Sequence, residues 1–329
     1  MKKRYLIGAL SGAAAVAVVT KLLTRPRDVD WATNRETIFH ADHSRFADVN
    51  GARMHYQEAG DRNAKPVILI HGFASSTLVW SKVFLEIASA GFRVIAPDLV
   101  GYGYSGKPRN FEYTIAGQAR MIVGLLDELG LQEVILVGSS YGGAVAATVA
   151  LDYPERVEKL VLVGAVTNNH PTRYMLMRLF GYPLVGDILS PLLAGSRRLL
   201  RRRMKRVYDR HEWVLDERRV QARHLPLRAA ATHRALVRTV RGWDAERIAT
   251  DANAIKQPTL VLWGENDREV PLCDGEHLRD AIYGSRLVVF RECGHLPHEE
   301  FPETFTELVV DFACREQSTK SHETALNDK

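Results

Sequence analysis

Cysteine is scarce in this sequence: only Cys273, Cys293 and Cys314 occur among 329 residues, and no two of them form a C-x-x-C pair. A disulfide framework and a structural zinc site are therefore excluded, whereas a single disulfide bridge is not. The chain also lacks an extreme composition, with 46% hydrophobic residues, 25% charged residues and a net charge of +5. These values exclude a disordered, collagen-like or multi-span membrane protein and leave one large domain or two small ones.

A long uncharged run occurs at the N-terminus, where Tyr5–Thr20 lies between Lys2-Lys3-Arg4 and a second basic flank that ends at Arg27. A basic, apolar and again basic order is typical of a segment directed to a membrane. The apolar part extends for about 19 residues, near the short end of the roughly 17–25 that span a bilayer. Residues 1–27 therefore predict a single-pass anchor, as in a bacterial inner membrane. The alternative is a signal that is cleaved during export.

Composition divides the rest of the chain. Residues 28–44 are polar and predict a linker, and residues 315–329 predict a polar, disordered tail. Between them, residues 45–314 predict one folded domain. It opens with a β-hairpin, because Asn50-Gly51 separates two alternating runs and both turn positions favour a positive φ.

Short apolar runs alternate with amphipathic ones from Pro66 onward. The predicted buried strands are 67–70, 93–96, 134–137, 160–163, 259–263 and 287–290, and the predicted helices are 78–90, 115–129, 142–153, 274–282 and 302–312. This alternation predicts the α/β class, with a mostly parallel sheet and helices on both faces. It is interrupted at about 165–254, where a stretch rich in Leu, Ala and Arg predicts a helical cap inserted between two strands.

The strongest motif follows the predicted strand 134–137. Gly138-Ser-Ser-Tyr-Gly142 fits G-x-S-x-G, with Ser140 at its centre and a helical run directly after it. A strand, a glycine-lined turn and a helix hold a serine hydroxyl clear of the backbone, as a nucleophile requires. Ser139 is the adjacent alternative, but only Ser140 has glycine at both −2 and +2.

A serine nucleophile requires a base and an anion that orients the base. Asp267 follows strand 259–263, with Glu265 as the alternative acid. His295 follows strand 287–290, with His298 as the alternative base. The expected triad is Ser140, Asp267 and His295, in the order serine, acid, histidine.

An oxyanion hole requires two backbone N–H groups beside the nucleophile. We expect one from Tyr141, the residue after the nucleophile, and one from Phe73 in His71-Gly72-Phe73. His71 is expected to buttress this loop, and Asp98 with Gly101 and Gly103 to shape a neighbouring one.

Five motifs in order carry a family resemblance: His71-Gly-Phe73, Asp98-Leu-Val-Gly-Tyr-Gly-Tyr-Ser105, Gly138-Ser-Ser-Tyr-Gly-Gly143, Gly264-Glu-Asn-Asp267 and Gly294-His295. Over roughly residues 45–314 the chain resembles α/β-hydrolases with a serine nucleophile and a helical cap, such as bacterial carboxylesterases, lipases and carbon-carbon bond hydrolases. The resemblance implies an α/β-hydrolase fold and hydrolysis through an acyl-enzyme. Ser140, where dehalogenases and epoxide hydrolases carry aspartate, argues against those two activities.

The expected activity is hydrolysis of carboxylic esters with apolar, possibly lipid-derived, acyl chains, without a metal or organic cofactor. The alternatives are a carbon-carbon bond hydrolase or an acyltransferase with the same triad, or a non-catalytic binding protein on the same fold.

The positive charge is concentrated in two places. Residues 1–27 hold six cations and no acid, and residues 173–241 hold seventeen cations and five acids, so the rest of the chain is acidic. Within the second region, Arg197–Arg206 carries seven cations in ten residues. It predicts either a solvated helix face or a segment attracted to an anionic membrane surface. The expected partners are thus a small ester or lipid and an anionic membrane surface; no nucleic-acid motif accompanies the charge.

Overall fold

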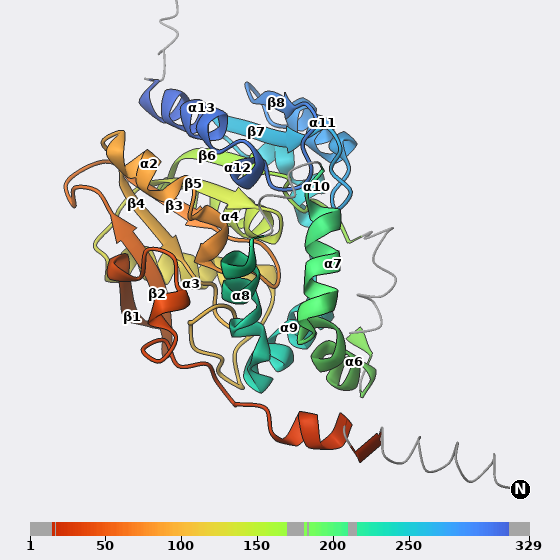
Figure 1. The fold of residues 1–329 in the computed structure, drawn as a ribbon. Helices are drawn as coiled ribbons and strands as arrows, with labels where there is room; N and C mark the ends of the chain where they lie inside the picture. The colour runs from red at the N-terminus through yellow and green to blue at the C-terminus, as the bar shows by residue number, and fades with distance from the viewer. Residues whose placement is uncertain (1–14, 17, 170–180, 183, 210–215, 316–329) are drawn as a thin grey trace, which may run out of the picture.

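An eight-stranded sheet forms the frame of the computed structural model, which describes residues 15–16, 18–169, 181–182, 184–209 and 216–315 (Figure 1). Its strand order is β1-β2-β4-β3-β5-β6-β7-β8. β1 and β2 pair antiparallel, as do β2 and β4, and the other pairs are parallel. The strands are β1 (Ser44–Val49), β2 (Ala52–Ala59), β3 (Pro66–Ile70), β4 (Arg93–Pro97), β5 (Val134–Ser139), β6 (Val157–Val163), β7 (Thr259–Gly264) and β8 (Arg286–Phe290).

Alternate residues of the central strands contact opposite helical layers. In β3, Ile68 and Ile70 pack with α3 (Ile115–Glu128), α4 (Tyr141–Asp152) and α11 (Leu272–Ala281). Val67 and Leu69 of the same strand pack with α2 (Phe84–Ser89) and α13 (Pro302–Cys314). Because both faces are covered, these strands are apolar throughout. The predicted α/β class, with a mostly parallel sheet and helices on both faces, is confirmed.

Two local predictions have different outcomes. The hairpin turn is present, with Asn50 at φ +47 and Gly51 at φ +79, the left-handed pair that a two-residue turn requires. The helix predicted over 78–90 is instead a short 3-10 turn, Thr77–Trp80, followed by α2. The turn is buried, and the indole of Trp80 stacks on His298 with ring centroids 4.3 Å apart. Tertiary packing therefore overrides the helical periodicity here.

Between β6 and β7 the described residues form helices and no strand. These are α6 (Val185–Ala194), α7 (Arg197–Val207), α8 (Glu217–His224), α9 (Ala230–Arg241) and α10 (Arg247–Thr250), with α6–α9 gathered at one side of the sheet (Figure 1). Residues 170–180, 183 and 210–215 of the predicted cap lie outside the described residues.

A buried carboxylate fastens these helices to the sheet domain. Glu299 lies on α12 (Pro297–Glu300) and is fully buried. It accepts hydrogen bonds from Arg219 Nη2 of α8 at 2.8 Å and from Arg223 Nη2 of α8 at 2.6 Å. The hydroxyl of Tyr208, at the end of α7, donates to the same carboxylate. Burial raises the pKa of Glu299, but the charges of Arg223 and Arg219 outweigh it and hold this pKa below its ordinary value.

The N-terminal prediction requires a correction. In the part of the chain that the structure describes, no helix is both long enough and apolar enough to cross a membrane, which contradicts the anchor predicted over 1–27. Of that segment, residues 15–16 and 18–23 are helical, and residues 1–14 and 17 lie outside the description.

Residues 28–44, predicted as a linker, make specific contacts with the domain. Asp28 forms an ion pair with the buried Lys107 at 3.2 Å, and His40 Nε2 hydrogen-bonds the carbonyl of Ser81 at 2.7 Å. Just before them, the carbonyl of Pro26 accepts a hydrogen bond from Ala230 N, at the start of α9. No side chain caps the N-terminus of α9, so the backbone carbonyl of Pro26 accepts one of the N–H groups that would otherwise be unpaired there. Of the predicted tail 315–329, only Arg315 lies within the described residues.

The Glu299 cluster leads to a prediction about stability. Glu299→Gln removes the one carboxylate between two buried guanidinium groups, and an uncompensated buried charge costs about 3 kcal/mol or more. We expect this loss in the free energy of unfolding, measured by urea denaturation. The control is Glu307→Gln on the exposed face of α13, which should change it by less than about 0.5 kcal/mol. Equal stability of the two variants would contradict the anchoring role.

Candidate active site

Ser140 occupies the sharp turn between β5 and α4. Its backbone has φ +55 and ψ −120, a conformation that costs energy for a residue with a Cβ. The flanking glycines are required by space: a Cβ on Gly138 would lie 2.3 Å from the carbonyl oxygen of Gly142, and a Cβ on Gly142 would lie 2.3 Å from that of Ile70. The G-x-S-x-G spacing therefore permits the strand to turn into the helix without collision.

Asp267 and His295 follow neighbouring strands, β7 and β8. His295 Nδ1 and Asp267 Oδ2 are 2.7 Å apart, and Asp267 Oδ1 accepts hydrogen bonds from the backbone N–H groups of Glu269 and Val270 at 2.8 and 2.9 Å. Both carboxylate oxygens are thus held, so the imidazole is oriented.

The two alternative residues lie elsewhere. Glu265 Oε2 accepts a hydrogen bond from the backbone N–H of Glu292 at 3.2 Å. His298 is fully buried against Trp80, and burial lowers its pKa to about 3. Neither arrangement brings these side chains into the Asp267–His295 pair.

Charge and burial act in opposite directions on His295. Burial lowers its pKa, but the charge of Asp267 and the hydrogen bond to it outweigh this, so the pKa lies above the ordinary value of 6.5. The charge of Arg203, on α7, acts in the lowering direction.

The end of β6 brings the serine turn and the Asp267–His295 pair together. Ser140 N donates to Val163 O at 2.9 Å, and Val166 N donates to Ser140 O at 3.1 Å. Between these two residues is Gly164, at φ +50, where a Cβ would lie 3.1 Å from His295 Nδ1 and 3.2 Å from Asp267 Oδ2. Gly164 could not be identified from the sequence, because its importance depends on neighbours more than 100 positions away.

The loop after β3 lies beside the serine. A Cβ on Gly72 would come within 3.0 Å of Ser140 Cβ, and Phe73 lines the same cavity as Ser140. His71 Nδ1 donates to Gly72 O at 2.8 Å, and Leu99 N donates to His71 Nε2 at 3.0 Å. Burial holds the pKa of His71 below its ordinary value, so the ring is neutral and braces the loop.

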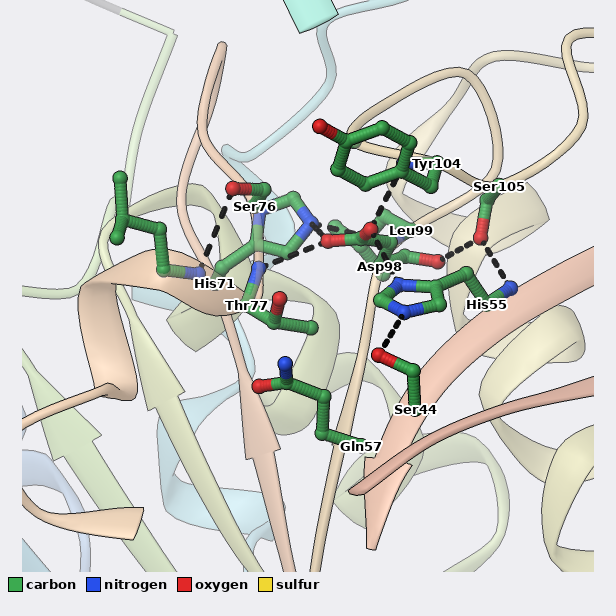
Figure 2. Close-up of polar contacts among 12 residues, drawn as sticks. Ser44, His55, Gln57, His71, Ser76, Thr77, Asp98, Leu99, Tyr104 and Ser105 are labelled. Carbon is green, nitrogen blue, oxygen red and sulfur yellow. Dashed lines mark hydrogen bonds and ion pairs between the residues drawn. The ribbon is translucent and has the colours of Figure 1, made fainter. Parts of the chain in front are cut away.

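Figure 2 shows the buried centre that supports this loop, built around Asp98. The carboxylate of Asp98 accepts hydrogen bonds from His55 Nδ1 at 2.7 Å, Thr77 N at 2.7 Å and Tyr104 N at 2.8 Å. Gly103 is obligatory here, because a Cβ would lie 2.1 Å from the carboxylate. Asp98 thus shapes the loops at residues 77 and 104. His55 was missed by the sequence analysis, since nothing on a hairpin strand marks it.

Ser140 and His295 line one cavity of about 1240 Å³ that α7 helps to enclose. Phe73, Trp243, Leu200 and Val270 give it apolar walls. One face of α7 contributes arginines to the same cavity. The attraction of this helix to an anionic membrane surface stays a prediction, whereas its contact with the cavity could not be read from the sequence.

The position of Gly164 leads to a prediction about geometry. Gly164→Ala places a methyl group against the Asp267–His295 pair, and a displacement of about 1 Å can reduce a rate about 10²-fold. We expect a loss of that size in the rate at which a fluorophosphonate labels Ser140. Gly130→Ala is the control, because Gly130 also has a positive φ, +67, but open space around it. Equal labelling rates in the two variants would contradict the prediction.

The sequence profile of the alpha/beta hydrolase fold family matches residues 65–302. The 2-hydroxy-6-oxo-6-phenylhexa-2,4-dienoate hydrolase of Comamonas testosteroni is 33% identical over 275 residues, which cover 80% of this chain and 92% of that protein. A serine hydrolase involved in carbazole degradation, CarC, superposes with a TM-score of 0.69 at 26% identity, over 82% of this chain and 98% of its own.

A membrane phospholipase A superposes with a TM-score of 0.70 over 94% of this chain and 98% of its own; at 24% identity this likeness shows the shared fold. The profile match spans well over half of the 329 residues. The chain therefore belongs to the alpha/beta hydrolase family.

Proposed function

We propose that this hydrolase uses Ser140 as the nucleophile, His295 as the general base and Asp267 to orient the imidazole. The observation that carries the proposal is the 2.7 Å contact between His295 and Asp267 beside a cavity that Ser140 also lines. The backbone N–H groups of Phe73 and Tyr141 form the proposed oxyanion hole. Tyr141 is the first residue of α4, so its N–H group belongs to the unpaired, positive end of that helix.

In the proposed reaction, His295 takes the proton of Ser140 while Oγ attacks a carbonyl carbon. The oxyanion of the tetrahedral intermediate is held by the two N–H groups. Collapse breaks the bond to the leaving group, which receives the proton from His295, and water then hydrolyses the acyl-enzyme by the same steps. These steps require this chain's own groups and water.

The bond cleaved is proposed to be a carbon-carbon bond next to a ketone. The support is the similarity, at 33% identity over most of both chains, to a hydrolase named for a 2-hydroxy-6-oxo-dienoate. Such a substrate must first become its 2-oxo tautomer, in which the proton of the 2-hydroxyl group has moved to C5. The carbanion that the tetrahedral intermediate then releases at C5 is delocalised as a dienolate onto the 2-oxo group, and it is protonated afterwards. Ester hydrolysis, the first expectation from the sequence, becomes the second candidate. The size and apolar walls of the cavity favour it.

A substrate panel separates the two reactions. We expect the protein to bleach 2-hydroxy-6-oxo-6-phenylhexa-2,4-dienoate with a kcat/KM at least about tenfold above that for 4-nitrophenyl butyrate. Ser140→Ala should lose both activities by about 10⁴-fold or more. Ser139→Ala tests the neighbouring hydroxyl and should stay within about tenfold of the unaltered protein. Dienoate turnover by Ser140→Ala at the full rate would contradict the assignment of Ser140 as the nucleophile. A higher kcat/KM for 4-nitrophenyl butyrate than for the dienoate would favour ester hydrolysis.

The pKa of His295 sets the expected pH dependence. Only the neutral imidazole accepts the serine proton, so kcat/KM should fall as the pH drops through the pKa of His295, which lies above 6.5. Asp267→Asn removes the charge that raises this pKa. The acid limb should then move to lower pH, while the maximal rate falls about 10⁴-fold. Glu265→Gln is the control and should leave the acid limb of the pH profile at the same pH. An acid limb that does not move in Asp267→Asn would contradict the proposed role of Asp267 beside His295.

A further inference from the structure

The arginines of α7 that line the cavity lie on one side of the helix. Arg202 and Arg203 lie four and three residues before Arg206 and line the cavity with it, as do Leu199, Leu200, Met204 and Val207 of the same helix. Such spacing places side chains on the same side of a helix. Arg197, Arg198 and Arg201 of the same helix do not contribute to the cavity wall. The arginine run is therefore divided into an inner and an outer set.

The position of α7 is fixed by apolar packing and by one backbone contact. Met204 and Tyr208 are buried against Val220 of α8 and Leu296. The carbonyl of Val207 accepts a hydrogen bond from His295 N at 2.8 Å. The inner arginines consequently belong to a helix held directly against the loop that carries His295.

The two sets differ in their ion pairs. In the outer set, Arg197 and Arg201 both pair with Glu217 of α8. In the inner set, Arg206 approaches Glu269 at 3.9 Å. Arg202 and Arg203 form no ion pair with another residue in the described part of the chain. Each set of three arginines thus has one carboxylate neighbour, and on the cavity side Arg202 and Arg203 are the guanidinium groups without a described ion-pair partner.

Outside α7, the described cavity wall holds charges of both signs. It adds two arginines, Arg223 and Arg241, and three carboxylates, Glu246, Glu269 and Asp274. Arg223 is already bound to Glu299, and Arg241 lies 3.7 Å from Asp187. A guanidinium group binds carboxylate or phosphate oxygens through paired N–H donors, which favours anions of either kind.

We propose that Arg202, Arg203 and Arg206 form an anion-binding face that selects substrates with a carboxylate or phosphate group remote from the scissile carbonyl. This inference rests on the proposed function only for the site of cleavage, near Ser140. The apolar walls receive the chain between the two groups. The face discriminates mainly through KM, because the bound anion does not change charge during the reaction.

A matched pair of esters tests the proposal. Mono-4-nitrophenyl glutarate and 4-nitrophenyl valerate have acyl chains of the same length and differ by a terminal carboxylate. The unaltered protein should show the lower KM for the glutarate. In Arg202→Gln/Arg203→Gln/Arg206→Gln we expect this KM to rise about tenfold or more, while the KM for the valerate stays within about twofold.

The outer arginines provide the control. Arg197→Gln/Arg198→Gln/Arg201→Gln removes the same charge from the same helix, and should leave the ratio of the two KM values within about twofold. Equal losses in the two triple variants would show a long-range field and overturn the proposal. An equal rise for both esters in the inner variant, or no preference in the unaltered protein, would also overturn it. If the inner triple variant does not fold, the single variant Arg203→Gln takes its place in the same comparison of the two KM values.

Direct binding separates this proposal from the proposed function. Calorimetry with glutarate, inorganic phosphate and neutral glutaramide requires no turnover. We expect an anion to bind the unaltered protein and the outer variant but not the inner variant, and glutaramide to bind none of them. Binding of glutarate or of phosphate alone identifies the group preferred, and binding of neither overturns the inference. If Ser140 is not the nucleophile, Ser140→Ala stays active. That result would not change the outcome of these binding titrations.

Discussion

Glu299 lies fully buried where α12 meets the end of α7 and the middle of α8, and its carboxylate accepts hydrogen bonds from Arg219, Arg223 and Tyr208. The cavity exists because these helices are held over the sheet, and Glu299 is only four residues beyond His295. One ionised group thus ties the enclosure of the cavity to the loop of the proposed base. Such a contact tolerates the removal of a single partner poorly, because the others are then left charged and buried.

The proposed catalytic groups depend on a second constraint, the close approach of backbone at the carboxyl ends of the strands. Gly138, Gly142 and Gly164 each lie where a Cβ would meet a neighbouring group within about 3 Å, and Ser140 itself has a positive φ. The centre at Asp98 braces the loops on the other side of the serine (Figure 2). Preorganised donors of this kind stabilise developing charge without reorganising during the reaction, which is the main use of such rigidity.

Charge in this chain is divided between its parts. Residues 173–241 are strongly basic, and the residues outside 1–27 and 173–241 are acidic in sum. Part of that basic charge faces the cavity, on the inner side of α7, where it acts on the pKa of His295 and, as proposed, on the substrate. The relatives support carbon-carbon cleavage more directly than ester cleavage, and either reaction begins with attack on a carbonyl carbon.

Much of the fold and of the candidate site could be predicted from local signals. Strand and helix periodicity predicted the sheet and its covering layers, and each proposed triad residue was located by the strand before it, since carboxyl ends of parallel strands meet at one edge. The helix predicted over 78–90 is present only as α2, because the packing of Trp80 is not set by local periodicity. The predicted membrane anchor is contradicted, since no described helix is long and apolar enough to span a membrane. Gly164, His55 and Glu299 could not be identified from the sequence, since their partners are distant in the chain.

The sequence by itself determined the alternation of elements and the G-x-S-x-G turn, which depend on neighbours along the chain. Only the tertiary structure decided which arginines face the cavity and which histidine meets Asp267, because those outcomes depend on how α7 and the loop after β8 pack.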